Sequence, residues 1–200
     1  GEAFGEHGVL CHGRSLHDEL IRVPLVLVGG PFRGGRVVET SVGLVDLFPT
    51  LFDALDMAPL DEIHGASQLD AIEKGDAGRP VQLFEERYTE NMGGQPTDVR
   101  MVGVRTHSHK YIVRYDVLAG TVIEELYDLR VDPRERDDLA VHGRVRDVRL
   151  DSELVAAIEA ARDRVWGAAD VASGQLQMGY AAQVGRVTVD RPEPILIGMR

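Results

Sequence analysis

The stretch VRMVGVRTHSHKYIVRY, residues 99–115, decides how the second half of the chain folds. Two runs rich in valine, isoleucine and tyrosine flank the polar letters THSH, and such runs favour strands that pair across a short turn. Similar runs lie on either side, at residues 81–87 and 121–129. The spacing predicts a small antiparallel sheet, with His107 and His109 in a solvated turn.

A helix is predicted after this sheet. Residues 151–166 place Leu154, Ile158, Ala161 and Val165 on one helical face, the pattern of an amphipathic helix packed on a sheet. Residues 167–200 are rich in glycine and weakly patterned, so we treat them as a tail.

The first part of the chain has the pattern of an α/β domain. After a glycine-rich loop, residues 15–23 predict a short helix that ends before Pro24. The run Leu25–Val28 is apolar on both faces, which predicts a strand buried on both sides of a sheet. Residues 37–42 suggest a second strand, and residues 47–55 a helix with Pro49 in its first turn. We therefore predict an α/β domain over 1–79, a sheet subdomain with a helix over 80–166 and a tail over 167–200.

Charge and composition exclude several classes of function. The chain carries 22 Lys and Arg against 33 Asp and Glu, a net charge of −11, which repels nucleic-acid phosphates. We expect no nucleic-acid partner. The longest apolar run is too short to cross a bilayer, so no membrane segment is expected. A single cysteine cannot form an internal disulfide or a cysteine-rich zinc site.

The histidines and the cysteine near residue 1 do not form a recognisable catalytic pattern. His7, His12 and His17 follow one another at five-residue intervals, which does not match the i, i+4 spacing of two metal ligands on one helix face. Cys11 stands next to His12, but adjacent residues rarely form a nucleophile and base pair. A three-histidine zinc site and a catalytic Cys11 are therefore both disfavoured.

Charged residues offer two further hypotheses. Glu2 and Glu6 could bind a hard cation such as Ca²⁺ or Mg²⁺, although loop carboxylates are usually just solvated. Arg105, Thr106 and Lys110 could bind an anion, although a polar strand end explains them more simply. Spacing alone thus shows no complete catalytic constellation.

A series of short motifs resembles a known family. They are GEAFGEHG at 1–8, HGRSL at 12–16, DELIRVPL at 18–25, VDLFPTL at 45–51, VRT at 104–106, KYI at 110–112, ELYDL at 125–129, DP at 132–133 and DLA at 138–140. Their joint order and spacing resemble the latter half of the sulfatase family. The resemblance implies the fold of the alkaline-phosphatase superfamily: a mixed sheet sandwiched by helices, followed by a small antiparallel sheet with a C-terminal helix.

The resemblance also implies an activity and its cofactors. Sulfatases hydrolyse sulfate esters with a formylglycine, made from the cysteine or serine of a C-x-P-x-R motif, and with a bound Ca²⁺. Gly1 matches the third residue of an Asp-His-Gly or Asp-Asn-Gly motif whose first two residues help to hold the metal. Cys11 is followed by His12, Gly13 and Arg14, which is not the nucleophile motif.

We therefore expect a C-terminal fragment of a metal-dependent sulfatase that is inactive alone. Its nucleophile and main metal ligands would lie upstream of residue 1, in a missing N-terminal portion of the same chain. The substrate would be a sulfated small molecule or sugar. Both an exported and a cytoplasmic location stay open.

His12 is the one substrate-binding residue that the resemblance implies. It matches a position where many sulfatases have a lysine, or sometimes a histidine, that touches the sulfate oxygens. A cation or N–H donor there can stabilise charge on the sulfuryl group. The alternative is that His12 only forms hydrogen bonds within its loop.

Two other functions stay open. A phosphoryl-transferring relative, such as a phosphonate monoester hydrolase or a phosphoglycerol transferase, shares much of the same framework. A non-catalytic module could also keep this fold for binding.

Overall fold

The computed structural model describes residues 1–32, 37–58, 63–76, 78–141, 154, 156–160, 187–188 and 196–197. Contacts divide the chain into two units, one of Gly1–Val23 with Leu83–Arg200 and the other of Pro24–Gln82. The domain boundaries suggested by the sequence stay a prediction. Within the described ranges, no helix is long and apolar enough to cross a membrane.

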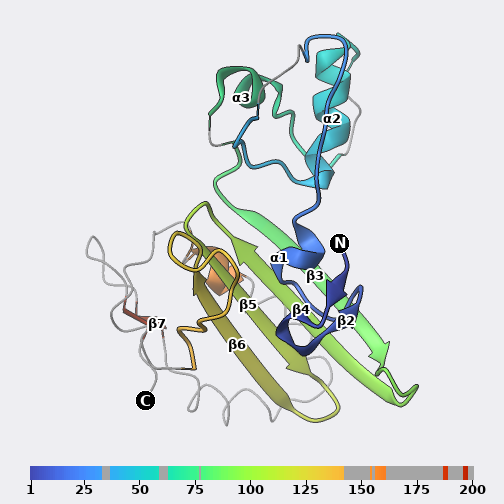
Figure 1. Ribbon diagram of the computed structural model, residues 1–200, viewed down its shortest axis with the longest axis vertical. Helices are drawn as coiled ribbons and strands as arrows, with labels where there is room; N and C mark the ends of the chain where they lie inside the picture. Colours follow the sequence, from blue (N-terminus) through green and yellow to red (C-terminus); the bar gives the residue numbers. More distant parts are fainter. Residues whose placement is uncertain are drawn as a thin grey trace. The chain divides into compact units, whose positions relative to one another are not determined.

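An antiparallel sheet of four strands forms the centre of the first unit (Figure 1). Its strands, in spatial order, are β3 (Gln82–Glu90), β4 (Pro96–Arg105), β5 (His109–Asp116) and β6 (Thr121–Asp128). Val102 on β4 pairs with Val113 on β5, and Tyr111 on β5 pairs with Leu126 on β6. All four side chains are buried. The antiparallel sheet predicted from the valine, isoleucine and tyrosine runs is confirmed, and so is the mixed α/β class.

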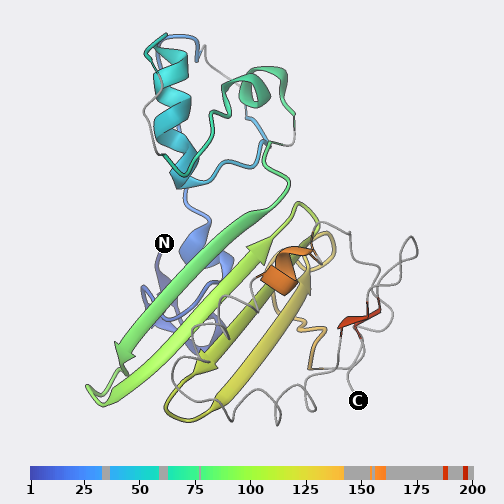
Figure 2. The same cartoon turned by 180° about the vertical axis from the view of Figure 1, so that it is seen from behind.

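Two segments from opposite ends of the chain cover the two faces of this sheet. One face carries the N-terminal segment, residues 1–23, with β1 (Ala3–Phe4), the 3-10 turn η1 (Glu6–Gly8), β2 (Leu10–Cys11) and α1 (Asp18–Ile21). The other face carries helical residues 154 and 156–160, with Leu154 and Ile158 buried (Figure 2). The rest of the helix predicted over 151–166 lies outside the described residues.

Leu16 joins the N-terminal segment to the sheet. It packs in a core cluster with Val99, Met101 and Ile112, and Tyr127 and Leu129 complete the cluster. Gly103 lies beneath it, where an added Cβ would stand 3.2 Å from Leu16 Cδ1. The missing side chain at Gly103 therefore leaves room for Leu16.

The second unit holds α2 (Leu44–Ala54) and α3 (Leu69–Lys74), and a buried carboxylate on α2 bonds to segments before and after α3. Asp46 accepts hydrogen bonds from the Gly43 N–H at 3.1 Å and the Ala66 N–H at 3.0 Å, and it pairs with the Arg79 guanidinium. Burial raises the pKa of Asp46, but the bonds from Arg79 and the backbone outweigh it, so the pKa lies below its usual range. The helix begins at Leu44, so Pro49 lies beyond its first turn, contrary to the prediction.

The buried strand predicted at Leu25–Val28 is wrong for this structure. These residues form no strand, and Val26 and Val28 are 80% and 88% exposed. A strand buried on both faces needs paired neighbours and covering layers. The described part of the second unit supplies only isolated bridges, such as Ser41 with Gly78, in place of the second predicted strand.

The core can be tested with one substitution and a matched control. Ile112→Ala removes a buried side chain from the cluster around Leu16 and should lower the free energy of unfolding by about 2–5 kcal/mol. Ile123→Ala on neighbouring β6 alters a side chain that is 49% exposed and should cost far less. Urea denaturation measures both, and equal losses would contradict this core.

Candidate functional site

A short hairpin presents the motif that contains His12. Ala3 pairs with Cys11 and Phe4 with Leu10, so β1 and β2 hold the loop between them. Three residues other than glycine have positive φ in this region: His7 at 51°, Cys11 at 68° and Arg14 at 64°. Such conformations cost about 1–3 kcal/mol each and persist only where surrounding contacts impose them, often at functional sites. His12 lies between two of them.

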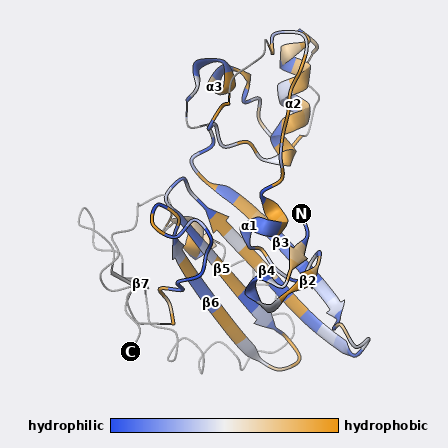
Figure 3. Cartoon of the chain, viewed as in Figure 1, coloured by the Kyte–Doolittle hydropathy of each residue, from blue (hydrophilic) through white to orange (hydrophobic). Residues whose placement is uncertain are grey.

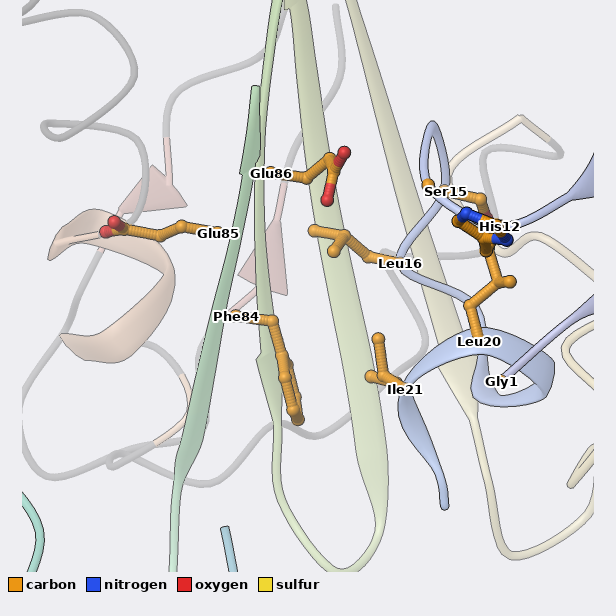
Figure 4. Close-up of a pocket in the computed structure, with 10 residues that line it drawn as sticks. Gly1, His12, Ser15, Leu16, Leu20, Ile21, Phe84, Glu85 and Glu86 are labelled. Atoms are coloured by element: carbon orange, nitrogen blue, oxygen red, sulfur yellow. The ribbon is translucent and has the colours of Figure 1, made fainter. Parts of the chain in front are cut away.

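His12 lines a pocket of about 250 Å³ between the N-terminal segment and β3. The pocket is lined by Gly1, His12, Gly13, Ser15, Leu16, Leu20, Ile21, Phe84, Glu85 and Glu86. Figure 4 shows Glu86 pointing toward the N-terminal segment and Glu85 pointing away from it. The pocket therefore combines an apolar lining with one inward carboxylate and one imidazole.

Glu2 orients the His12 ring. Its Oε2 lies 3.0 Å from His12 Nδ1, and the His12 side chain is 81% exposed. With Nδ1–H donated to this carboxylate, Nε2 faces outward and can meet a ligand. Glu6 is not part of this arrangement, because its Oε2 accepts the Phe4 N–H at 2.6 Å. Among the described residues, Glu2 and Glu6 do not form a group of metal ligands.

Four charged side chains form a buried ion-pair cluster: Asp18, Arg105, Lys110 and Glu135. Lys110 Nζ is 2.9 Å from Asp18 Oδ1 and 2.7 Å from Glu135 Oε1, and the Lys110 side chain is fully buried. Arg105 Nη2 lies 3.4 Å from Asp18 Oδ2. Lys110 and Arg105 thus already face carboxylates, and Thr106 is buried in the turn after β4. They do not form the anion site considered from the sequence.

The cluster shifts the pKa values of its two carboxyls in opposite directions. Burial raises the pKa of Asp18, but the charge and hydrogen bond of Lys110 outweigh it, and the pKa lies below its usual range. Burial raises the pKa of Glu135, and Lys110 offsets this only in part. Glu135 Oε2 also accepts the Asp18 N–H at 2.8 Å, which joins the segment after β6 to the start of α1.

His7 and His17 stack against each other beside this cluster. Their ring centroids lie 3.7 Å apart and the ring planes differ by 4°. Sequence reasoning missed this pair, because ten residues separate them and only the turn of the chain brings them together. His12 is not in the group, so the three-histidine arrangement does not form.

The stacked pair does not fit Ca²⁺. His7, His17 and Glu19 offer potential ligand atoms within 4.8 Å of one another, the one such group among the residues the structure describes. Ca²⁺ takes six to eight oxygen ligands, whereas this group offers two nitrogens and one carboxylate. Imidazole lone pairs lie in the ring plane, so an ion between two stacked rings would lie outside both planes.

Cys11 and His109, two other candidates from the sequence, differ in exposure. Cys11 is exposed and unpaired with another cysteine, and it lies outside the His12 pocket lining. His109, expected in a solvated turn, is instead buried as the first residue of β5 opposite Asp128. Strand β5 begins one residue before the apolar run that predicted it, and this places His109 inside the sheet. His107 is exposed in the turn, as predicted.

Comparison with known proteins places the chain among sulfatases. Residues 5–163 match the model of N-sulphoglucosamine sulphohydrolase, C-terminal. The uncharacterized sulfatase YidJ of Escherichia coli is 29% identical over 155 residues, covering 74% of this chain and 28% of that protein. Arylsulfatase K of Mus musculus is 27% identical over 161 residues, covering 77% of this chain and 28% of that protein. The chain thus spans little more than a quarter of the length of these relatives.

A solved structure shows the same fold. The crystal structure of a protein assigned to the sulfatases, from Bacteroides thetaiotaomicron, matches with a TM-score of 0.60 at 23% identity. The match covers 100% of this chain and 40% of that one.

The ion-pair cluster is tested by removing its cation. Lys110→Met removes the cation shared by two buried carboxylates, so that Asp18 keeps only Arg105, and should lower the free energy of unfolding by about 3–5 kcal/mol at neutral pH. The stabilisation of ionised Asp18 is present above its unfolded pKa and is lost as pH falls through its lower folded pKa. The difference between the two proteins should therefore shrink in acid.

The matched control is Lys74→Met, which breaks an exposed pair with Asp70 on α3 and should leave stability nearly unchanged. Chemical denaturation at neutral and acid pH measures all three proteins. A Lys110→Met variant as stable as the control would disprove the role of the cluster.

Proposed function

The chain belongs to the family of N-sulphoglucosamine sulphohydrolase C-terminal domains, and from this premise we propose that it is the C-terminal part of a sulfatase that hydrolyses sulfate esters. The observation that carries the proposal is the family match over residues 5–163, which includes the strained loop around His12. The substrate would be a sulfated small molecule or a sulfated sugar.

His12 would contact the sulfate group. An N–H donor or cation held in place before the reaction stabilises the charge that develops on transferred and leaving oxygens. Nδ1 faces the Glu2 carboxylate, so Nε2 can donate to a sulfate oxygen only when the His12 ring carries both protons. Glu86 lines the same pocket, and its carboxylate would repel a sulfate. We therefore assign the contact to the outward side of His12 rather than to the interior of the pocket.

The metal and the nucleophile would come from other parts of the enzyme. The described residues offer no oxygen-rich group that fits Ca²⁺, and Cys11 is not in a C-x-P-x-R motif. Ca²⁺ and formylglycine, which the resemblance implies, are thus proposed for the remainder of a sulfatase chain. The residues described here would contribute the substrate contact and its support.

An exposed apolar stripe on α2 indicates a surface that contacts another part of the enzyme. Leu44, Phe48 and Leu55 lie within one helical face of α2 and its end, and they are 70%, 52% and 62% exposed. Figure 3 shows that much of α2 is hydrophobic. Exposed apolar patches of this kind usually mark an interaction surface. Because the sulfatase relatives are several times longer than this chain, we propose that the remainder of the sulfatase covers the stripe.

Substitution of His12 tests the proposed substrate contact. In the complete enzyme, His12→Ala should lower kcat for an aryl sulfate about 100-fold, as loss of one such donor does elsewhere. His64→Ala, in the other unit, is the matched control and should leave the rate unchanged. Assays with an aryl sulfate and a phosphonate monoester measure both variants.

Three results would change the assignment. An unchanged rate in His12→Ala would remove the substrate contact. Faster turnover of the phosphonate ester than of the sulfate would favour the phosphoryl-transferring relative. Absence of turnover with either substrate would favour a binding module.

A further inference from the structure

Both ring nitrogens of His7 face hydrogen-bond acceptors. Nδ1 lies 2.8 Å from Glu19 Oε1, and Nε2 lies 2.7 Å from the carbonyl oxygen of Glu135. A carbonyl cannot donate a hydrogen bond, and neither can an ionised carboxylate. His7 must therefore donate from both nitrogens, and only the imidazolium form carries both protons.

The groups around His7 favour this positive charge. Glu19 faces it from α1, and Glu135 faces it from the segment after β6. Glu125 on β6 lies beyond the stacked His17 ring. The ion-pair cluster adds little net charge, because the cations Lys110 and Arg105 pair with the carboxyl groups of Asp18 and Glu135.

The pKa of His7 agrees in direction with the geometry. Burial of the ring lowers its pKa, but the hydrogen bonds to Glu19 and to the Glu135 carbonyl and the nearby negative charges outweigh burial. The net effect raises the pKa above its usual value. The corresponding stability is fully present below the unfolded pKa and is lost as pH rises through the folded pKa.

His17 has different contacts, which suit a neutral ring. Its Nδ1 lies 2.6 Å from Ser15 Oγ, a hydroxyl that can donate, and its Nε2 lies 3.2 Å from Glu125 Oε2. One ring proton satisfies both contacts. The contacts of the stacked pair thus allow one cation beside one neutral ring, an arrangement without repulsion between two positive charges.

His7 lies in the same hairpin as His12. It occupies η1 between β1 and β2, in a left-handed conformation, and β2 ends at the residue before His12. Its two hydrogen bonds reach α1 and the segment after β6. These bonds join the hairpin to both segments.

We propose that His7 is a positioning residue, which as an imidazolium holds the hairpin carrying His12 against the sheet subdomain and releases it when a rise in pH removes the proton. Where His12 touches the substrate, as in the proposed function, loss of this proton would set the upper pH limit of turnover. The role in holding the hairpin does not itself depend on catalysis.

A titration of the intact 200-residue chain by nuclear magnetic resonance tests this proposal. The His7 ring should show two N–H groups at neutral pH and lose one with a midpoint above that of an ordinary histidine. The Gly13 amide and the His12 ring should report the same midpoint, because the hairpin moves with the His7 proton. In the complete enzyme, kcat should fall as pH rises through the same midpoint, with little change in KM.

His7→Gln and His64→Gln separate positioning from mere folding. His7→Gln should abolish the shared transition at Gly13 and His12, whereas the control His64→Gln should keep it. If His7→Gln does not fold, the titration of the unsubstituted chain still tests the proposal.

Two results would overturn the proposal. One is a His7 ring with a single N–H at neutral pH, or a titration that Gly13 and His12 do not follow. The other is displacement of the His7 proton by one equivalent of Zn²⁺ with joint shifts of His7 and His17, which would make the pair a metal site. The titration does not depend on hydrolysis. A chain that shows the titration but supports no sulfatase activity would therefore disprove only the proposed function.

Discussion

The burial of one ammonium group, that of Lys110, constrains the rest of the sheet unit. An unpaired buried charge is very costly, so Lys110 must meet carboxylates. They come from two segments distant in the sequence, Asp18 at the start of α1 and Glu135 after β6. The central strand β5 is thereby joined to both segments, and the Asp18 N–H donates to Glu135 as well. Packing of Leu16 adds an apolar contact to the same face.

This constraint explains how a short, strained hairpin can keep a definite position. Positive φ at His7, Cys11 and Arg14 disfavours the observed conformation locally. The contacts of His7 with Glu19 and Glu135, next to the buried cluster, oppose that strain. His12 is then presented beside Glu2 by backbone that two neighbouring segments restrain. In the proposed sulfatase, a rigid support of this kind would favour electrostatic catalysis, since a donor held in place needs no reorganisation.

Local patterns predicted the elements whose partners are close in the sequence. The runs around the THSH turn specify β4 and β5 because hairpin pairing is local and β-branched and aromatic residues favour strands. Leu25–Val28 failed because a buried strand depends on neighbours that its own letters do not reveal. The ion pairs of Lys110 could not be predicted for the same reason: its partners lie 92 and 25 positions away in the chain. The spacing of the histidines likewise does not predict that His7 stacks on His17. His12 was singled out only through resemblance to a family, and its role stays a prediction.

The buried cluster holds the N-terminal segment, and with it His12, on the sheet. Amide hydrogen exchange of Lys110→Met, measured under conditions where the variant stays folded, tests this role. Exchange should become faster at the hairpin amides, such as those of Gly5 and Val9, while the amides between β4 and β5 keep their relative protection. Unchanged protection of the hairpin, or an equal loss over the whole sheet, would contradict it.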